Sequence, residues 1–149
     1  MPVNKEKGTA ISVLATFYSL DYGTNYLRNI GILNEHTTPV ATSTSFAGGG
    51  NAQPTIGTGI IGYLQAGYVL PRLKNGTSFM PYLTATYKDF ERLKDPSFQW
   101  GLGLNYFITG HNAKITMEYA TRPIYVLSGQ DVIRNGTKGQ LTLQTHIFL

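Results

Sequence analysis

The sequence has no cysteine and few charges, and these two absences narrow what the chain can be. Without cysteine, disulfide frameworks, thiol catalysis and thiolate metal sites are excluded. Charged residues make up 13% of the 149 residues, against about a quarter in ordinary soluble domains. The formal net charge of +4 is scattered and contains no Lys/Arg block, so we expect no nucleic-acid partner.

Long hydrophobic runs are missing as well. No stretch of 18 apolar residues occurs, which rules out a transmembrane helix. The chain is instead rich in glycine and aromatic residues, with 17 Gly, 10 Tyr and 7 Phe. Together with the low charge, this composition favours β-structure whose faces meet something other than bulk water.

Apolar and polar residues alternate in six segments, which is the period-two pattern of strands with one apolar face. The pattern is clearest at the carboxyl end, where Leu141 and Leu143 alternate with Thr142 and Gln144. Each segment is close to the roughly 9–11 residues that a tilted strand needs to cross a bilayer. The predicted strands cover residues 9–20, 59–70, 78–91, 98–109, 113–127 and 138–149.

The connections between these segments alternate in length. The links at 71–77 and 110–112 are short, and the first contains Asn75-Gly76, a strong hairpin signal. Outer-membrane barrels have short periplasmic turns and longer external loops. We therefore predict that residues 2–8 are part of a further periplasmic turn. We predict external loops at about 21–58, 92–97 and 128–137.

The placement of charge favours a membrane barrel over a soluble sheet. The central parts of the apolar faces carry no charge, whereas Lys88, Lys114, Glu118 and Arg122 lie on the opposite faces. A basic residue turned toward lipid near the bilayer midplane costs roughly 2–4 kcal/mol, so the apolar faces must meet the lipid. A soluble antiparallel sandwich or ligand-binding barrel also alternates, and it stays open as an alternative on pattern alone.

The alternation assigns residues to two faces of the barrel. Aromatic residues near strand ends on the apolar faces suit an interfacial girdle, and the polar faces suit a water-filled lumen. The girdle candidates are Phe17, Tyr68, Trp100 and Tyr106. The pore-lining candidates are Tyr82, Lys88, Arg92, Lys114, Glu118, Arg122, Gln144 and His146.

The lumenal charges allow two interpretations. Lysine and arginine side chains in a pore favour anions, and Lys88, Lys114 and Arg122 share the predicted inner face. Alternatively, Glu118 pairs with Lys114 or Arg122 in a structural network of the wall.

Two prolines conflict with a continuous ladder of hydrogen bonds. Pro81 and Pro123 lack a backbone donor, and a closed barrel has no free edge to accommodate them. We therefore place both near strand ends, at a rim or a bulge.

Nothing in the sequence indicates catalysis, a metal site or a cofactor. The three histidines, His36, His111 and His146, are far apart and fall on a loop, a turn and a strand. No Ser/His/Asp set and no close pair of carboxylates is apparent, so we do not expect an enzyme.

Several motifs resemble the porin O and P family, in its branch from Bacteroidetes-type bacteria. They are Tyr63-Leu64-Gln65-Ala66-Gly67-Tyr68, Pro81-Tyr82, Tyr87-Lys88-Asp89-Phe90, Gly101-Leu102-Gly103-Leu104-Asn105-Tyr106-Phe107, Gly110-His111-Asn112-Ala113-Lys114-Ile115, Arg122-Pro123 and the ending Leu143-Gln144-Thr145-His146-Ile147-Phe148-Leu149. The likeness covers roughly residues 58–149 well and 1–30 more loosely. It implies a sixteen-stranded homotrimeric channel in the outer membrane of a Gram-negative bacterium. In the best-known members it also implies anion or phosphate selectivity.

The sequence thus predicts an all-β fold, an antiparallel transmembrane β-barrel of porin type. Residues 1–149 would be the carboxyl-terminal portion of one barrel domain, contributing about six of roughly sixteen strands. The amino terminus has no apolar segment of a signal peptide, so we expect a fragment lacking its beginning. The expected function is passive diffusion of small hydrophilic solutes, with a preference for anions or phosphate. A structural or partner-binding barrel in the same lipid is the alternative.

Overall fold

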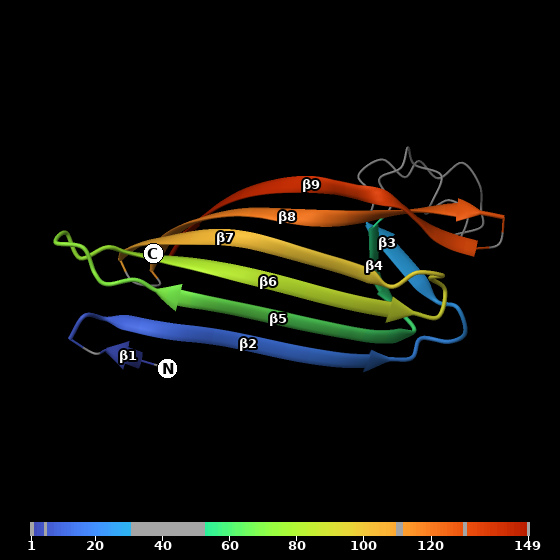
Figure 1. The fold of residues 1–149 in the computed structure, drawn as a ribbon, viewed down its shortest axis with the longest axis horizontal. Coiled ribbons are helices and arrows are strands. Elements are labelled where there is room, and N and C mark those ends of the chain that lie inside the picture. Colours follow the sequence, from blue (N-terminus) through green and yellow to red (C-terminus); the bar gives the residue numbers. More distant parts are fainter. Residues whose placement is uncertain (1, 5, 31–52, 110–111, 130, 149) are drawn as a thin grey trace.

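The chain folds into a single curved antiparallel sheet with a small hairpin at one end (Figure 1). The structure is a computed structural model and describes residues 2–4, 6–30, 53–109, 112–129 and 131–148. All elements in these ranges are β-strands. They are β1 (Pro2–Asn4), β2 (Thr9–Leu20), β3 (Leu27–Ile30), β4 (Gln53–Gly57), β5 (Gly59–Val69), β6 (Ser78–Phe90), β7 (Ser97–Thr109), β8 (Ala113–Ser128) and β9 (Asp131–Ile147).

The strand order of the main sheet is β1-β2-β5-β6-β7-β8-β9, and β3 pairs with β4 in a separate two-stranded sheet. Apart from this inserted hairpin, strands that are consecutive in sequence are neighbours in the sheet. Short links favour this arrangement because they join antiparallel strands. The sheet is not closed, since β1 and β9 lie at opposite ends of the strand order. The part of the chain that the structure describes contains no helix with the length and hydropathy needed to cross a membrane.

The six strands predicted from the alternation are present. Five of them, β2 and β5 to β8, agree with the predicted ranges to within one residue at each end. The all-β antiparallel part of the fold prediction is therefore confirmed.

The sixth strand, β9, is longer than predicted, and the external loop expected at 128–137 is wrong. β8 continues to Ser128 and β9 begins at Asp131, with Gly129 at a positive φ of 63° in the turn between them. The dipeptide Asn135-Gly136 is typical of turns, but Gly136 lies inside β9 with a φ of 93°. It sits where the β8–β9 register shifts, so the glycine forms a β-bulge rather than a loop.

Two other predicted connections contain strands. Residues 2–8 are not all turn, because β1 pairs with the start of β2 through Pro2↔Ala10 and Asn4↔Thr9. The long link at 21–58 contains β3 and β4, while its residues 31–52 lie outside the described part of the chain. The links at 71–77 and 92–97 are connections as expected.

The two prolines occupy the kinds of position that their missing donors require. Pro123 lies at the register shift between β8 and β9. Pro81 is the fourth residue of β6, and the β5–β6 register ends one residue away at Gly67↔Tyr82. Backbone bonding between these strands resumes where the Leu70 amide donates to the Phe79 carbonyl. Pro81 therefore interrupts the ladder near a strand end.

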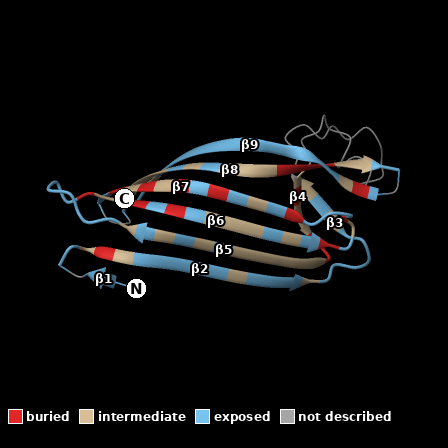
Figure 2. Cartoon of the chain, in the orientation of Figure 1, coloured by how far each residue is buried: buried red, intermediate tan, exposed pale blue. Residues whose placement is uncertain are grey.

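Buried side chains form two small clusters instead of a core between two layers. Phe90, Leu93, Tyr125 and Val132 form the first, at the end of the sheet where β3 and β4 lie. Met80, Tyr82 and Phe107 form the second, nearer the chain termini. Between them the buried residues appear only as scattered positions along the strands (Figure 2). The face of the sheet that is opposite to these clusters carries large, exposed apolar side chains, and no described element covers it.

Candidate functional site

The pairing register carries the alternation across the whole sheet and separates its side chains onto two faces. In β6, Leu83 pairs with Leu102, and the preceding residue, Tyr82, pairs with Gly103. Leu83 and Leu102 are more than half exposed, whereas Tyr82 is buried. Neighbouring positions of one strand therefore face different surroundings, as a pleated strand requires.

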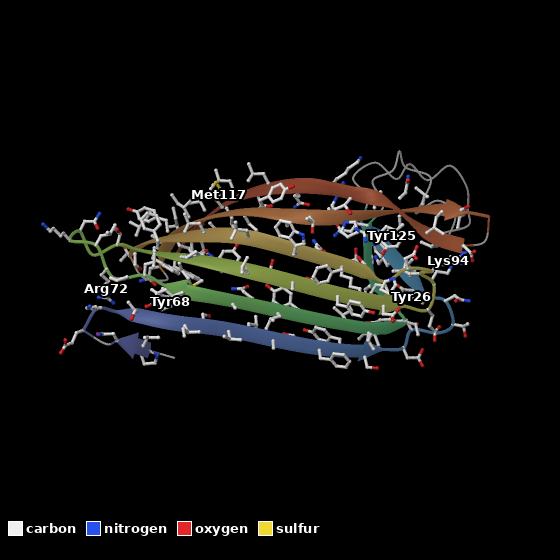
Figure 3. The ribbon with its side chains drawn as sticks, in the orientation of Figure 1. Tyr26, Tyr68, Arg72, Lys94, Met117 and Tyr125 are labelled. Carbon is white, nitrogen blue, oxygen red and sulfur yellow. The ribbon has the colours of Figure 1, made fainter. Side chains whose placement is uncertain are left out.

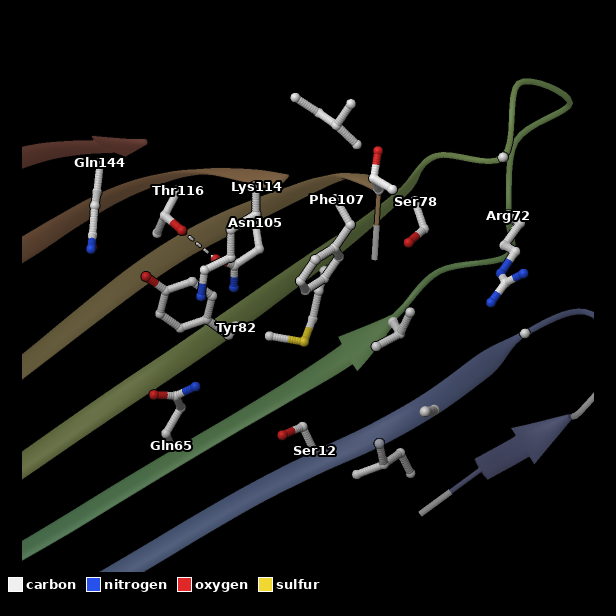
Figure 4. Close-up of a pocket in the computed structure, with 18 of the residues that line it drawn as sticks. Ser12, Gln65, Arg72, Ser78, Tyr82, Asn105, Phe107, Lys114, Thr116 and Gln144 are labelled. Carbon is white, nitrogen blue, oxygen red and sulfur yellow. Dashed lines mark hydrogen bonds between the residues drawn. The ribbon is translucent and has the colours of Figure 1, made fainter. Parts of the chain in front are cut away.

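The polar face is concave, because residues of β2 and of β5 to β9 line one open hollow of about 960 Å³ on it. Figure 4 shows side chains from these strands converging on that space. Beside apolar residues, uncharged polar side chains make up a large part of its lining. They include Ser12, Gln65, Ser78, Tyr82, Asn105, Thr116 and Gln144.

Most of the predicted pore-lining residues lie on this concave face. Tyr82, Lys114, Glu118 and Gln144 line the hollow itself. Lys88 follows on the same side of β6. Arg122 of β8 lies on the concave face because it shares the alternation of Lys114 and Glu118. His146 of β9 lies there too, because it pairs with Lys114. Arg92 is the exception, since it belongs to the connection between β6 and β7 rather than to the wall.

The Tyr82 phenol donates a hydrogen bond of 2.6 Å to Glu118 Oε2. The two residues belong to β6 and β8, with β7 between them. Gly103 pairs with both, so no side chain separates the phenol from the carboxylate. A Cβ on Gly103 would lie 2.1 Å from the Tyr82 ring. Glycine at this position therefore allows the close approach.

Two further hydrogen bonds on this face were not predicted from the sequence. Thr116 Oγ1 donates to Asn105 Oδ1 at 2.5 Å, as Figure 4 shows. The Tyr63 phenol donates to Gln65 Oε1 at 2.8 Å. The sequence did contain a signal for the first pair, because Asn105 and Thr116 both occupy polar positions of neighbouring predicted strands. The register between the two strands could not be read from the alternation alone.

At the other end of the concave face, the inner side chains contact β4. The Lys88 ammonium donates to the Pro54 carbonyl at 2.9 Å. The Gln53 amide donates to Gln99 Oε1 at 3.2 Å. Lys88 was predicted to line the pore, but its bond to β4 is a contact that alternation alone does not indicate.

The opposite, convex face carries aromatic residues near both ends of the strands. The first aromatic band consists of Tyr68, Phe79 and Tyr106, and the rings of Phe79 and Tyr106 stack at 4.8 Å. The second aromatic band consists of Phe17, Tyr87, Phe98 and Trp100. Figure 3 shows Tyr68 at the end of β5, far from Tyr125 at the opposite end of the sheet.

The register connects the members of each aromatic band. Tyr87 pairs with Phe98 on one side and with Gly62 on the other, and Gly62 pairs with Phe17. All four predicted girdle residues thus lie on the convex face, two in each band. Phe79, Tyr87 and Phe98 were missed as girdle residues, although Phe79 and Tyr87 share the alternation of Leu83, and Phe98 shares that of Trp100.

Uncharged residues fill the convex face between the two aromatic bands. One row, followed through the pairing register, contains Val13, Ala66, Leu83, Leu102, Tyr119 and Leu141. The side chain of Leu141 is 71% exposed. In water such a surface would be far larger than the apolar patches that soluble monomers usually expose.

Comparisons with models of protein families, with curated proteins and with solved structures find no match to this chain. The resemblance to the porin O and P family therefore stays a prediction from the sequence. Within the described ranges, no three His, Asp or Glu side chains lie close enough to hold a metal ion. His36 and His111 are outside those ranges.

Proposed function

We propose that this chain forms part of the wall of a porin-type β-barrel in a bacterial outer membrane. The barrel would let small hydrophilic solutes diffuse passively along its polar inner face. The observation that carries this proposal is the separation of the two faces. Across six paired strands, exposed apolar side chains gather on the convex face and polar ones on the concave face.

The spacing of the aromatic bands supports contact of the convex face with lipid. Phe79 and Tyr87 are eight residues apart in β6, and so are their partners Tyr106 and Phe98 in β7. Eight residues span roughly 26 Å along a strand. At the tilt of transmembrane strands this corresponds to about 20 Å across the membrane, within the apolar band of about 25 Å of outer-membrane barrels.

The concave face supports a water-filled passage for uncharged or weakly charged solutes. Its hollow is lined by hydroxyl and amide side chains alongside apolar ones, and its charged lining residues are Arg72, Lys114 and Glu118. The Lys88 ammonium is already bound to a carbonyl. These contacts support a general diffusion channel more directly than a channel that prefers anions or phosphate. Anion or phosphate preference and the trimeric assembly are narrower proposals that rest on the family resemblance.

A soluble sandwich or binding barrel would need a second layer over the apolar face, and no described element supplies one. A structural or partner-binding barrel in the same membrane would share the two faces but would not conduct.

Two measurements test the proposal on the native protein purified from outer membranes. Heat-modifiable mobility in detergent gels distinguishes a membrane barrel from a soluble protein, and we expect a shift on boiling. In planar lipid bilayers we expect reproducible open channels. A protein that stays soluble without detergent would contradict the membrane location. A detergent-dependent barrel without conductance would contradict the porin function.

A further inference from the structure

Charges of opposite sign are separated along the wall of the hollow. Glu118 and Lys114 both line it and both belong to β8. They are four residues apart, which places their backbones roughly 13 Å from each other. Within the described ranges the two side chains form no ion pair with each other. The carboxylate and the ammonium therefore do not neutralise each other by direct contact.

The pairing register shows what lies between these two charges. Thr116, midway between Glu118 and Lys114, pairs with Asn105 on one side and with Gln144 on the other. This middle row of the wall carries two amide side chains and a hydroxyl. Rows on one face of a sheet follow each other at roughly 7 Å along the strand. The hollow thus presents a carboxylate, then amides, then an ammonium.

Hydroxyl groups of neighbouring residues occupy oxygens of this wall and leave its amide N–H groups for other partners. Thr116 Oγ1 donates to Asn105 Oδ1, so the amide nitrogen of Asn105 keeps its two donors. Figure 4 shows this nitrogen and the Lys114 ammonium on the side of the hollow. At Glu118 the Tyr82 phenol bonds Oε2, while the side chain is partly exposed and Oε1 stays available as an acceptor.

A second cation lies at the Lys114 end of the hollow. Arg72 belongs to the connection between β5 and β6, and it lines the same space beyond Ser78 (Figure 4). Ser78 pairs with Phe107, which in turn pairs with Lys114. The described lining residues contain no further lysine or arginine. One end of the hollow is therefore basic, and the carboxylate of Glu118 stands apart from it.

We propose that the hollow binds zwitterionic solutes and that short peptides are the class that fits it. Glu118 accepts from the ammonium group of the peptide, and Lys114 donates to its carboxylate. The amides of the middle row bond the peptide group between them. Hydrogen bonds of about 2.8 Å at each end leave roughly 7 Å of the separation, which is the reach of two extended residues. This inference rests on the proposed channel function and names a solute class for it.

The arrangement of charges discriminates against other small solutes. An anion would gain contacts with Lys114 and Arg72 but would be repelled by the Glu118 carboxylate. A neutral sugar would use the amides and leave the charged groups without a partner of opposite sign. Only a ligand that carries both charges at a matching distance satisfies all three parts of the wall.

Glycylglycine and its capped forms test this inference. In planar bilayers containing the native protein, we expect glycylglycine to block the current reversibly. N-acetylglycylglycine lacks the ammonium, and glycylglycinamide lacks the carboxylate. Each should bind about fivefold more weakly, the effect of losing one exposed charge pair. Glucose and inorganic phosphate serve as the neutral and anionic probes, and both should block less than glycylglycine.

Two substitutions assign each end of the ligand to one residue. Glu118→Gln should remove the preference for glycylglycine over its N-acetyl form, and Lys114→Gln should remove the preference over the amide. A merely structural role would weaken all ligands alike. The matched controls are Asp131→Asn and Lys94→Gln, because these residues form an exposed ion pair at 3.5 Å outside the hollow. Both preferences should persist in these controls.

Binding to the native protein in detergent, measured by equilibrium dialysis with radiolabelled glycylglycine, separates this inference from the channel function. If the protein binds the dipeptide but does not conduct, the channel function fails and the binding site stands. If it conducts without binding glycylglycine, or binds the capped forms equally well, the inference is overturned. Equal weakening of all ligands by Glu118→Gln or Lys114→Gln, or tighter binding of phosphate or glucose, would overturn it as well.

Discussion

The phenol of Tyr82 reaches the carboxylate of Glu118 across an intervening strand, over the bare backbone of Gly103. This row of three residues joins β6, β7 and β8 on the concave face. Because the phenol is buried, the bond fixes one carboxylate oxygen in a direction set by the backbone register. A methyl group added at Gly103 would therefore disturb this hydrogen bond.

Gly103→Ala should destabilise the protein and release Tyr82 from Glu118. The new methyl group would overlap the ring, and overpacking of this kind costs about 1–3 kcal/mol. Equilibrium unfolding in urea with lipid vesicles measures the change in the free energy of unfolding. The control is Gly62→Ala, because a Cβ at Gly62 meets nothing within 4 Å. Equal losses in the two variants would show that the Tyr82–Glu118 contact is not set by Gly103.

Leu102→Arg should destabilise the inserted barrel strongly. Leu102 is 54% exposed on the convex face, midway between the aromatic bands. An arginine facing lipid at such a depth costs about 2–4 kcal/mol. The same unfolding experiment applies, with Gln144→Arg on the concave face as a control that should change little. A similar small effect at both positions would contradict lipid contact of the convex face.

Trp100 should report the membrane interface by itself, since it is the single tryptophan of the chain. Its side chain is exposed in the second aromatic band, and indole rings favour the level of the headgroups. We expect its fluorescence to be quenched best by lipids brominated close to the headgroup, and least by lipids brominated near the chain ends. Strongest quenching by lipids brominated near the chain ends, or no quenching by any lipid, would contradict the position of the second aromatic band at the membrane interface.

Glu118→Gln and Lys114→Gln should move charge selectivity in opposite directions. Both side chains line the hollow, so loss of the carboxylate favours anions and loss of the ammonium favours cations. The reversal potential under a salt gradient measures each shift. Glutamine at 118 retains an oxygen that accepts from Tyr82, which keeps the local geometry.

The control for these two variants is Asp131→Asn. Asp131 is exposed at the end of the β8–β9 hairpin and pairs with Lys94 at 3.5 Å, away from the hollow. It should leave the reversal potential unchanged. If Glu118→Gln and Lys114→Gln shifted the reversal potential in the same direction, these residues would not line the conducting path.

The strands and the assignment of faces could be predicted because both depend on local alternation. A strand that is apolar at every second position indicates its own length and its two faces, as β5 to β8 do. The predicted pore-lining residues other than Arg92 share the concave face and the predicted girdle residues share the convex face, and their contact with a pore or with lipid stays a prediction. No long-range information was needed for this part.

Features that depend on contacts between distant residues could not be predicted in the same way. The hairpin β3–β4 has short strands without clear alternation, and it is held by Lys88, Thr58 and the Phe90 cluster from elsewhere in the chain. Asn135-Gly136 has the composition of a turn, and only its position opposite Ile124, between the pairs Pro123↔Thr137 and Tyr125↔Arg134, makes it a bulge. The reach of Tyr82 to Glu118 required the register of three strands.

The last strand of the sheet, β9, has a neighbour on one side only in the described chain. Its amide and carbonyl groups on the other side would find no hydrogen-bond partners in hydrocarbon. If a sheet enters lipid with such an edge open, each peptide group without a hydrogen-bond partner raises the free energy of insertion. Membrane entry and the arrival of an adjoining antiparallel strand must therefore be coupled, so isolated sheets of this kind should aggregate in water before they insert.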